Sequence, residues 1–422
     1  MTESSPSHVS QGGGGDKVVD VAVVGAGAAG LMAGIWAGRT NPNRRIVLLD
    51  GAKSLGAKIL VAGGGRCNVT HHAVDESAYA GSSRKAIRNV LRRFDVPETV
   101  AFFREIGVTL KREEAGKLFP TTDSARTVLN ALLQEAHRVG ATIRHPCRVT
   151  KIDREQDTFL VRGEWGSLRT SRLILATGGK SLPKTGSDGL GYRFAQSLGH
   201  SVSERIFPAL VPLTLDKSDA LVELSGITLP ATIELRSGNG KRLISFTDST
   251  LITHFGLSGP SVLDISRYYL DEIEDDPDAH LTMNWLPNET AESLDQSLRN
   301  ARGETIGRLL TARLPERLGC LLCAQVGVAF NKPIDQLGRE KRRSLVRQMT
   351  EMPLAVTGHR GYTHAEVTAG GVPLSEIQLK TMASRQCPGL HLCGEICDVD
   401  GRIGGFNFQW AWASGFVAGI SV

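Results

Sequence analysis

The apolar pattern of the chain begins with a run from Val19 to Val24, in which five of the six residues are apolar and four are valine. A continuous run of this length is typical of a strand in a parallel sheet, because both faces of such a strand are covered. A glycine-rich, helix-like segment follows, and a second apolar run at 46–49 ends on Asp50. This order predicts a βαβ unit.

The glycines of this unit indicate a bound dinucleotide. Gly25, Gly27 and Gly30 have the G-x-G-x-x-G spacing, which lets the turn tighten and lets a pyrophosphate approach the N–H groups at a helix N-terminus. Asp50 stands twenty residues after Gly30 and can accept hydrogen bonds from a ribose diol. The glycine motif alone is weak evidence, but strand, glycines, helix, strand and acid in this order are strong evidence.

Two further glycine loops are candidates for the same site. Gly63 to Gly65 precede Arg66, Cys67 and Asn68, which predicts close approach to a ligand, with a plain tight turn as the alternative. The segment LILATGG at 173–179 predicts another buried strand, and its final turn should face the cofactor because ligands bind at the carboxyl ends of such strands.

The end of the chain repeats this pattern of an apolar run followed by a glycine-rich loop. A predicted strand at 390–393 is followed by Gly394 and Glu395, and a loop with three more glycines leads into a final helix. The N-terminus of that helix, near Phe406 and Asn407, can direct N–H groups at a flavin ring that becomes anionic on reduction. Glu395 can hold ribitol hydroxyls.

The middle of the chain has a different pattern. Short β-rich runs broken by Pro, Gly, Asp and Asn at 201–287 predict a small antiparallel barrel or sandwich, and helical spacing at 288–357 predicts a helical subdomain. The flanking segments, 17–200 and 358–422, are expected to form one α/β domain. Residues 1–16 lack the features of a signal peptide and are expected to form a disordered tail.

The composition is that of an ordinary globular protein, with 422 residues, 41% hydrophobic and 22% charged. Seven cysteines, an odd number, predict reduced thiols and a cytoplasmic location. Cys320 and Cys323 form a C-x-x-C without metal-ligand company, so no stably bound metal is expected. The uncharged stretch at 21–38 contains five glycines in the fingerprint region, so no membrane segment is expected either.

The net charge of +5 permits an anionic partner but does not require one. Two basic clusters lie at 84–93 and 339–347, and the first includes arginines four residues apart at Arg84, Arg88 and Arg92. Such clusters are usually solvated helix faces. An RNA-docking surface is the alternative interpretation, although no RNA-binding module is visible.

Together these motifs resemble the BaiN-type flavoproteins, also called aminoacetone oxidase family FAD-binding enzymes, within the two-dinucleotide-fold, glutathione-reductase-like class. The resemblance spans nearly the whole chain and rests on KILVAGGGRCNVT (58–70), GKLFPTTDSARTVL (116–129), ATGGKSLPKTGSDGLGYRFAQSLGH (176–200), ITHFGLSGPSVLDIS (252–266), TAGGV (368–372) and GEICDVDGRIGGFNFQWAWASG (394–415). It implies an α/β fold: a Rossmann-like FAD-binding domain with a three-layer parallel sheet, interrupted by an inserted antiparallel β-barrel plus helical bundle. One departure is Asp50, where members of the family commonly have glutamate.

The expected FAD contacts come from the glycine turns, the 58–68 loop and the C-terminal motif. They are Gly25, Gly27, Ala28, Ala29, Gly30, Asp50, Gly51, Lys58, Gly64, Gly65, Arg66, Cys67, Asn68, Val149, Thr177, Gly178, Gly179, Gly394, Glu395, Gly404, Gly405, Phe406 and Asn407. No second nucleotide fingerprint is visible, so NADH or NADPH is expected to bind only transiently, as electron donor.

Bound FAD leads first to hydride transfer at flavin N5. The preferred interpretation is a reductase that delivers hydride to a polarised C=C bond, in an enone or a uracil ring, including a uridine of ribosomal RNA. Cys67 is the first candidate acid and His254 the second, with simple packing and a structural histidine as the alternatives. An oxidase of a small amine and an RNA-binding flavoprotein are the rival interpretations. The sequence leaves open the choice between a small-molecule and an RNA substrate, and also the oligomeric state.

Overall fold

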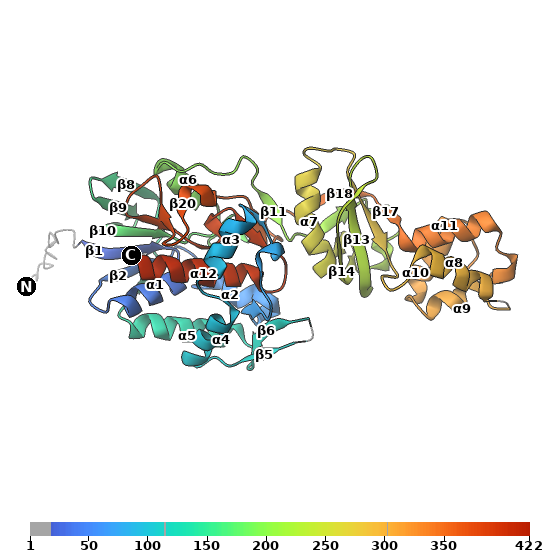
Figure 1. Cartoon of the computed structure of the whole chain (residues 1–422), viewed down its shortest axis with the longest axis horizontal. Coiled ribbons are helices and arrows are strands. Elements are labelled where there is room, and N and C mark those ends of the chain that lie inside the picture. The colour runs from blue at the N-terminus through green and yellow to red at the C-terminus, as the bar shows by residue number, and fades with distance from the viewer. Residues whose placement is uncertain (1–17, 114, 302) are drawn as a thin grey trace, which may run out of the picture.

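The computed structural model describes residues 18–113, 115–301 and 303–422. The predicted tail at 1–16 therefore lies outside the described residues. Figure 1 shows an elongated molecule in which a large α/β part contains both the first and the last described residues. The middle of the sequence extends away from it. Within the described ranges, no helix is long and apolar enough to cross a membrane.

The centre of the α/β part is a mixed sheet with the strand order β20-β21-β22-β10-β1-β2-β7. The parallel strands are β1 (Val19–Val24), β2 (Ile46–Leu49), β7 (Thr142–Arg144), β10 (Gly166–Leu175) and β22 (Leu390–Leu392). An antiparallel edge comes from β20 (Ile377–Gln378) and β21 (Ala383–Ser384), and β8 (Lys151–Glu155) and β9 (Thr158–Gly163) extend β10. The apolar runs identified β1, β2 and the end of β10, because β2, most of β1 and the last three residues of β10 are buried.

Two helices pack closely beside this sheet, α1 (Ala28–Thr40) and α12 (Phe406–Ser421) (Figure 1). Glycines of α12 permit the close approach: a Cβ on Gly415 would lie 2.6 Å from the carbonyl oxygen of Ala29, and one on Gly419 would lie 2.5 Å from that of Ala33. The backbone of one helix therefore rests on the other. Their packing fixes the position of both N-termini.

The remaining elements of this part are shorter. They are α2 (Ala57–Val61), β3 (Thr70–His71), β4 (Tyr79–Gly81), α3 (Arg84–Leu91), α4 (Val96–Glu105), β5 (Leu110–Arg112), β6 (Lys117–Pro120), α5 (Ala125–Arg138), α6 (Leu190–Ser197), β11 (Phe207–Ala209), β19 (Val367–Ala369) and β23 (Val399–Gly401). β11 pairs with β19, and β4 pairs with β23. These pairings join segments from the two ends of the chain.

The insertion contains a seven-stranded antiparallel sheet with the order β17-β16-β13-β14-β15-β12-β18. Its strands are β12 (Leu213–Leu215), β13 (Thr228–Arg236), β14 (Arg242–Thr253), β15 (Gly256–Ser258), β16 (His280–Asn284), β17 (Met352–Leu354) and β18 (Val356–His359). The predicted closed barrel is corrected, because β17 and β18 stand at opposite edges of the order and do not pair with each other. β12 is three residues long, and its pairing with β18 shifts register after Thr214.

Five helices accompany this sheet in the described part of the insertion. The helix α7 (Pro260–Glu272) packs on β13 and β14. The other four lie within the stretch that the sequence predicts as helical: α8 (Ala291–Asn300), α9 (Ile306–Thr311), α10 (Glu316–Gln325) and α11 (Arg339–Thr350). Their apolar residues share one core with the sheet, and Cys323 lies inside that core.

The largest apolar core of the α/β part is formed by residues from both flanking segments, between 19 and 198 and between 372 and 422. A second large core uses residues between 213 and 354. The division predicted at about residues 200 and 358 stays a prediction.

Candidate functional site

A cavity of about 940 Å³ lies where the strands β1, β10 and β22 end. Its lining includes the residues that follow these strands, such as Gly25, Thr177 and Gly394. Ligands of doubly wound sheets bind at the carboxyl ends of the strands. The volume is near the upper end of the range for small-molecule sites.

The first wall of the cavity is the turn between β1 and α1. Gly25 has φ +101°, and a Cβ there would lie 2.4 Å from the carbonyl oxygen of Ala176, so this tight turn requires glycine. A Cβ on Gly27, which lines the cavity, would meet no described atom within 4 Å. No described side chain caps α1, and its first turn carries no acid. Its free N–H groups and dipole therefore suit an anion such as a pyrophosphate.

Asp50 stands beside this turn at the end of β2. Its Oδ2 accepts a hydrogen bond from the N–H of Ala26 at 2.7 Å, and its Oδ1 accepts one from Ala52 at 2.8 Å. The side chain is buried yet lines the cavity. A carboxylate oxygen has two lone pairs, so each oxygen retains capacity for a further donor. Asp50 thus fixes the glycine turn and can still receive ribose hydroxyls.

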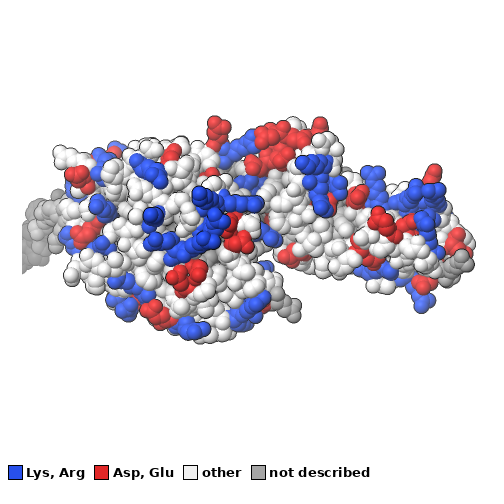
Figure 2. Space-filling view, viewed as in Figure 1, with Lys and Arg blue, Asp and Glu red and all other residues white. Residues whose placement is uncertain are grey.

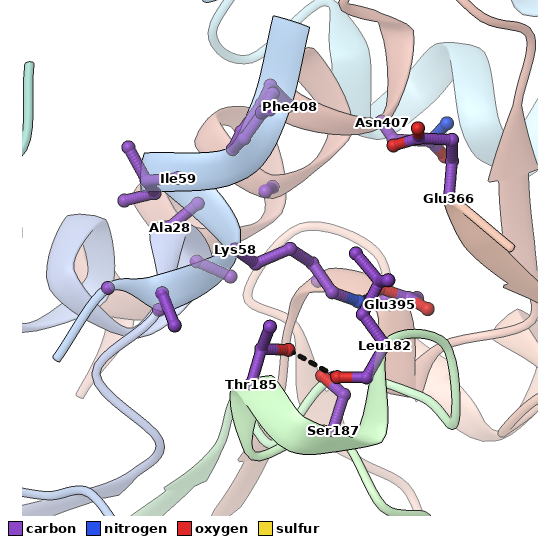
Figure 3. Close-up of a pocket in the computed structure, with 18 of the residues that line it drawn as sticks. Ala28, Lys58, Ile59, Leu182, Thr185, Ser187, Glu366, Glu395, Asn407 and Phe408 are labelled. Atoms are coloured by element: carbon purple, nitrogen blue, oxygen red, sulfur yellow. Dashed lines mark hydrogen bonds and ion pairs between the residues drawn. The ribbon is translucent and has the colours of Figure 1, made fainter. Parts of the chain in front are cut away.

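A polar network crosses the cavity between α2 and the C-terminal motif. The Nζ of Lys58 lies 2.7 Å from Glu395 Oε2 and donates to Ser181 Oγ at 2.9 Å. Glu395 Oε1 accepts hydrogen bonds from Ser181 Oγ at 2.9 Å and from the N–H of Thr368 at 3.0 Å. Figure 3 shows the Lys58 side chain extending toward Glu395. The network ties together four segments that are remote in sequence.

Another wall of the cavity is the N-terminus of α12. Gly405 precedes the helix with φ +98°, and a Cβ there would lie 2.6 Å from the carbonyl carbon of Thr70. As with α1, this first turn has no acid and no cap from a described side chain. Asn407 lines the cavity, but its amide both accepts from and donates to the backbone of Gly401, at 2.8 Å each. Asn407 therefore holds the 401–405 loop in place.

Two buried polar atoms at the cavity have no partner within the described chain, Asn68 Oδ1 and Thr177 Oγ1. A buried polar atom without a hydrogen bond lowers the stability of the fold, so we expect a ligand or water to bind both atoms. Together with the two uncapped helix N-termini, they fit a long molecule with a phosphate group and polar edges. The donor and acceptor set is suited to FAD.

Most of the predicted cofactor residues line the cavity. They are Gly25, Gly27, Ala28, Ala29, Asp50, Gly51, Lys58, Gly64, Arg66, Asn68, Val149, Thr177, Gly178, Gly394, Glu395, Gly404, Gly405 and Asn407. Five others do not line it: Gly30, Gly65, Cys67, Gly179 and Phe406. Gly30 has a packing role, because a Cβ there would lie 1.9 Å from the carbonyl oxygen of Gly25. Phe406 is buried and its ring stacks on that of His71, with 5.0 Å between the ring centroids.

Neither predicted acid reaches the cavity. The Cys67 side chain is fully buried, and burial raises the pKa of its thiol to about 12. His254 is exposed at the turn between β14 and β15, where its ring contacts Phe255. Neither side chain belongs to the lining of the cavity, and a catalytic role for either stays a prediction.

One acidic residue at the cavity was missed by sequence reasoning. Glu366, labelled in Figure 3, lines the cavity directly before β19. Its side chain is exposed toward this space, yet enough protein surrounds it that burial raises the pKa of its carboxyl, against an opposing effect of Lys58. It precedes the TAGGV segment without belonging to a recognisable motif, so the sequence carried no signal for it.

No group of three or more His, Cys, Asp or Glu side chains in the described ranges is arranged to hold a metal ion. Cys320 and Cys323, the C-x-x-C pair, lie on α10, and burial raises the pKa of both thiols.

Comparisons with known proteins place the chain in a family. The sequence model described as HI0933-like protein Rossmann domain matches residues 19–421. The 3-dehydro-bile acid delta(4,6)-reductase of Clostridium scindens is 33% identical over 403 residues, which cover 94% of this chain and 98% of the relative. The ribosomal RNA dihydrouridine synthase of Escherichia coli is 34% identical over 398 residues, which cover 94% of this chain and 96% of the relative.

A solved structure of a mutant quinol fumarate reductase FrdA from E. coli shares the fold, with a TM-score of 0.50 at 17% identity, over 95% of this chain and 69% of that chain. The chain therefore belongs to the HI0933-like family, which confirms its predicted place among the BaiN-type flavoproteins and, with it, the predicted class of flavin-dependent oxidoreductase.

Proposed function

We propose that this protein is an FAD-dependent reductase that saturates a polarised C=C bond. When bound, the flavin supplies hydride chemistry at N5, and the protein binds and orients the reactants. The two relatives support the direction of the reaction, because a delta(4,6)-reductase and a dihydrouridine synthase both add two hydrogens across a C=C bond. An enone and a uracil ring share a carbonyl conjugated to that bond.

The cavity is the observation that carries the proposal. It combines two uncapped helix N-termini with the unpartnered atoms of Asn68 and Thr177. We assign the ADP half of FAD to the N-terminus of α1 and to Asp50. The flavin half is assigned to the N-terminus of α12, where N–H groups favour the negative charge of a reduced ring.

The test is an assay of the purified holoenzyme with enones and with small amines. We expect consumption of NADH or NADPH that depends on the enone and yields the saturated ketone. Peroxide release with an amine under air, without enone reduction, would instead identify the rival amine oxidase.

The electron donor is proposed to be NADH or NADPH, bound transiently at the flavin. Anaerobic mixing with each nucleotide should bleach the flavin absorbance within the turnover time for the true donor. Bleaching by neither would require a separate reductase as donor.

A uridine in RNA is the second candidate substrate, and a specific surface favours it. Figure 2 shows Lys and Arg side chains gathered over the region where Figure 1 places α3. Arg88 pairs with Glu76 at 3.1 Å, whereas Arg92 and Arg93 are exposed and have no ion-pair partner within the described chain. Exposed arginines of this kind suit phosphate contacts.

RNA binding would depend on salt, because each phosphate neutralised releases counterions. The log–log slope is expected to have a magnitude of roughly 0.7 to 0.9 per phosphate. Reversing two charges, Arg92→Glu with Arg93→Glu, should weaken binding and flatten this slope. A second double variant, Arg339→Glu with Arg343→Glu, tests the basic cluster on α11, which Figure 1 places at the far end of the insertion. Comparison of the two double variants distinguishes the contributions of the two clusters to binding. Binding that is unchanged in both double variants would exclude docking of RNA on these helices.

A further inference from the structure

Most charged side chains of the cavity are committed to partners. The pairs and contacts are Lys58 with Glu395, Arg66 with Glu113, Arg148 with Asp188, Arg402 with Asp264, and Asp50 with two backbone N–H groups. These contacts stabilise ionised side chains, and an ion-paired carboxylate is a poor source of protons.

Glu366 is different. Among the described residues its carboxyl has no hydrogen-bond or ion-pair partner, although it lines the same cavity. Its backbone is held on both sides: its N–H donates to the carbonyl of Leu210 at 3.2 Å, and its own carbonyl accepts from Ser181 Oγ at 3.3 Å. The side chain is therefore presented from a fixed position.

Glu366 and Asn407 line the same cavity, and Figure 3 draws both in the part of the view away from Thr185 and Ser187. Ser181 Oγ donates to the carbonyl of Glu366 at 3.3 Å and to Glu395 Oε1 at 2.9 Å, which ties Glu366 to the polar network of the C-terminal motif. Asn407 belongs to the first turn of α12. A substrate that lies against the flavin ring would thus come within reach of Glu366.

We propose that Glu366 is the proton donor of the reductase, an inference that rests on the proposed function. In the balanced step, a hydride carrying two electrons passes from the reduced flavin to the β-carbon of the C=C bond, and the flavin is oxidised. The O–H bond of Glu366 breaks as a C–H bond forms at the α-carbon. The resulting carboxylate regains its proton from solvent, and the nicotinamide nucleotide supplies the next two electrons.

The environment of Glu366 suits this role. A proton donor must carry its proton at the working pH, and burial raises the pKa of this carboxyl in spite of nearby Lys58. Because only the protonated form can act, the rate of substrate reduction should be constant at low pH and fall as the pH rises through the raised pKa.

The test is the variant Glu366→Gln, which keeps the size of the side chain but has no acidic proton. General acids typically contribute about 10²- to 10⁴-fold, so we expect reoxidation of the reduced flavin by an enone to slow by that factor. Flavin content and reduction by dithionite should not change. Glu366→Asp, which retains a carboxyl, should recover part of the rate and the fall at high pH.

A second measurement does not depend on activity. In an infrared pH titration, the wild-type holoenzyme should show a C=O band of a protonated carboxylic acid that persists above the usual pKa of a glutamate, and Glu366→Gln should lose this component of the spectrum. Glu274→Gln, an exposed position in the turn after α7, is the matched control and should leave both the band and the rate unchanged.

Two outcomes overturn the inference in distinguishable ways. If the wild-type reduced enzyme reacts with an enone and Glu366→Gln reacts equally fast, or if the infrared titrations of the wild type and Glu366→Gln are identical, Glu366 is not the donor and the proposed function stands. If the wild-type reduced enzyme reacts with no C=C substrate, the proposed function fails and the donor role falls with it.

Discussion

At the scale of single residues, Asp50 joins the glycine turn to the predicted ribose site. Its carboxylate holds the N–H groups of Ala26 and Ala52, and it faces the cavity. Loss of hydrogen bonds to a charged group costs about 1.5–3 kcal/mol, so Asp50→Ala should weaken retention of FAD roughly 10- to 100-fold. Flavin absorbance after extended dialysis measures this. Asp20→Ala, which removes an exposed carboxylate of β1 paired with Arg45, is the control. A fully yellow Asp50→Ala protein would contradict the assignment.

His391 in β22 makes stability depend on pH. Burial, with a smaller effect of Arg172, lowers the pKa of this histidine from its usual 6.5 to about 4. A depressed pKa in the folded state adds stability above the unfolded value of 6.5, and this stability is lost as the pH falls toward 4. At 1.36 kcal/mol per pH unit, acidification to about pH 5 should remove about 2 kcal/mol.

The measurement is urea unfolding near neutral pH and near pH 5, for the wild type and for His391→Gln. The difference between the two proteins is the readout, because burial also raises the pKa of Asp398 to about 6, and that carboxyl acts in the opposite direction. The variant should lose less stability on acidification than the wild type. His137→Gln, at an exposed position on α5, should follow the wild type. Parallel pH dependence in the wild type and His391→Gln would refute the assignment.

Some residues of the site could be predicted from local spacing in the sequence, and others could not. The turn glycines and Asp50 could be predicted because their spacing follows from backbone requirements that are local in sequence. The burial of Cys67 could not be predicted, because it depends on how the 62–70 loop packs. Glu366 could not be found from the sequence. Its proposed role follows from the fact that neighbouring charged side chains form ion pairs, whereas its carboxyl has no partner among the described residues.

At the scale of elements, the packing of α1 on α12 positions both helix N-termini at the cavity. A Cβ on Gly415 would lie 2.6 Å from the backbone oxygen of Ala29, so Gly415→Ala forces the helices apart. Overpacking of this kind costs about 1–3 kcal/mol, and displacement of the helix ends should also weaken flavin retention. Thermal or urea unfolding and flavin release measure the two effects.

Gly338→Ala is the matched control, because a Cβ at the start of α11 would meet no described atom within 4 Å. Its stability and flavin content should equal those of the wild type. A Gly415→Ala protein with unchanged stability would show that the two helices are not held as closely as the structure indicates.

Elements differed in how far the sequence could predict them. The strands β1 and β2 and the end of β10 were predicted because a buried parallel strand is a nearly continuous apolar run. The inserted sheet was predicted as a barrel, but whether a sheet closes depends on register and on pairing of its edges. β17 and β18 are only one residue apart in sequence and still end at opposite edges. No local pattern encodes that outcome.

At the scale of the whole molecule, α7 of the insertion is fastened to the loop before α12. Asp264 accepts hydrogen bonds from Arg402 at 2.9 Å and from the N–H of Ile403 at 2.8 Å. On the same helix, Arg267 donates to the buried Asp400 at 3.0 Å. Arg402 and Ile403 line the cavity, so the insertion helps to shape the site. These cross-connections were invisible in sequence because the partners are more than 130 positions apart.

One cavity is therefore proposed to serve both reduction of the flavin and reduction of the substrate. The central proposal is that reduced flavin in this cavity passes hydride to a polarised C=C bond. The most direct test is anaerobic stopped-flow mixing of the reduced holoenzyme with an enone or with a uridine-containing RNA. We expect the oxidised flavin spectrum to return at a rate that depends on the concentration of one of these substrates, with formation of the saturated product. Flavin that stays reduced with both substrates, but is reoxidised rapidly by oxygen, would contradict the account.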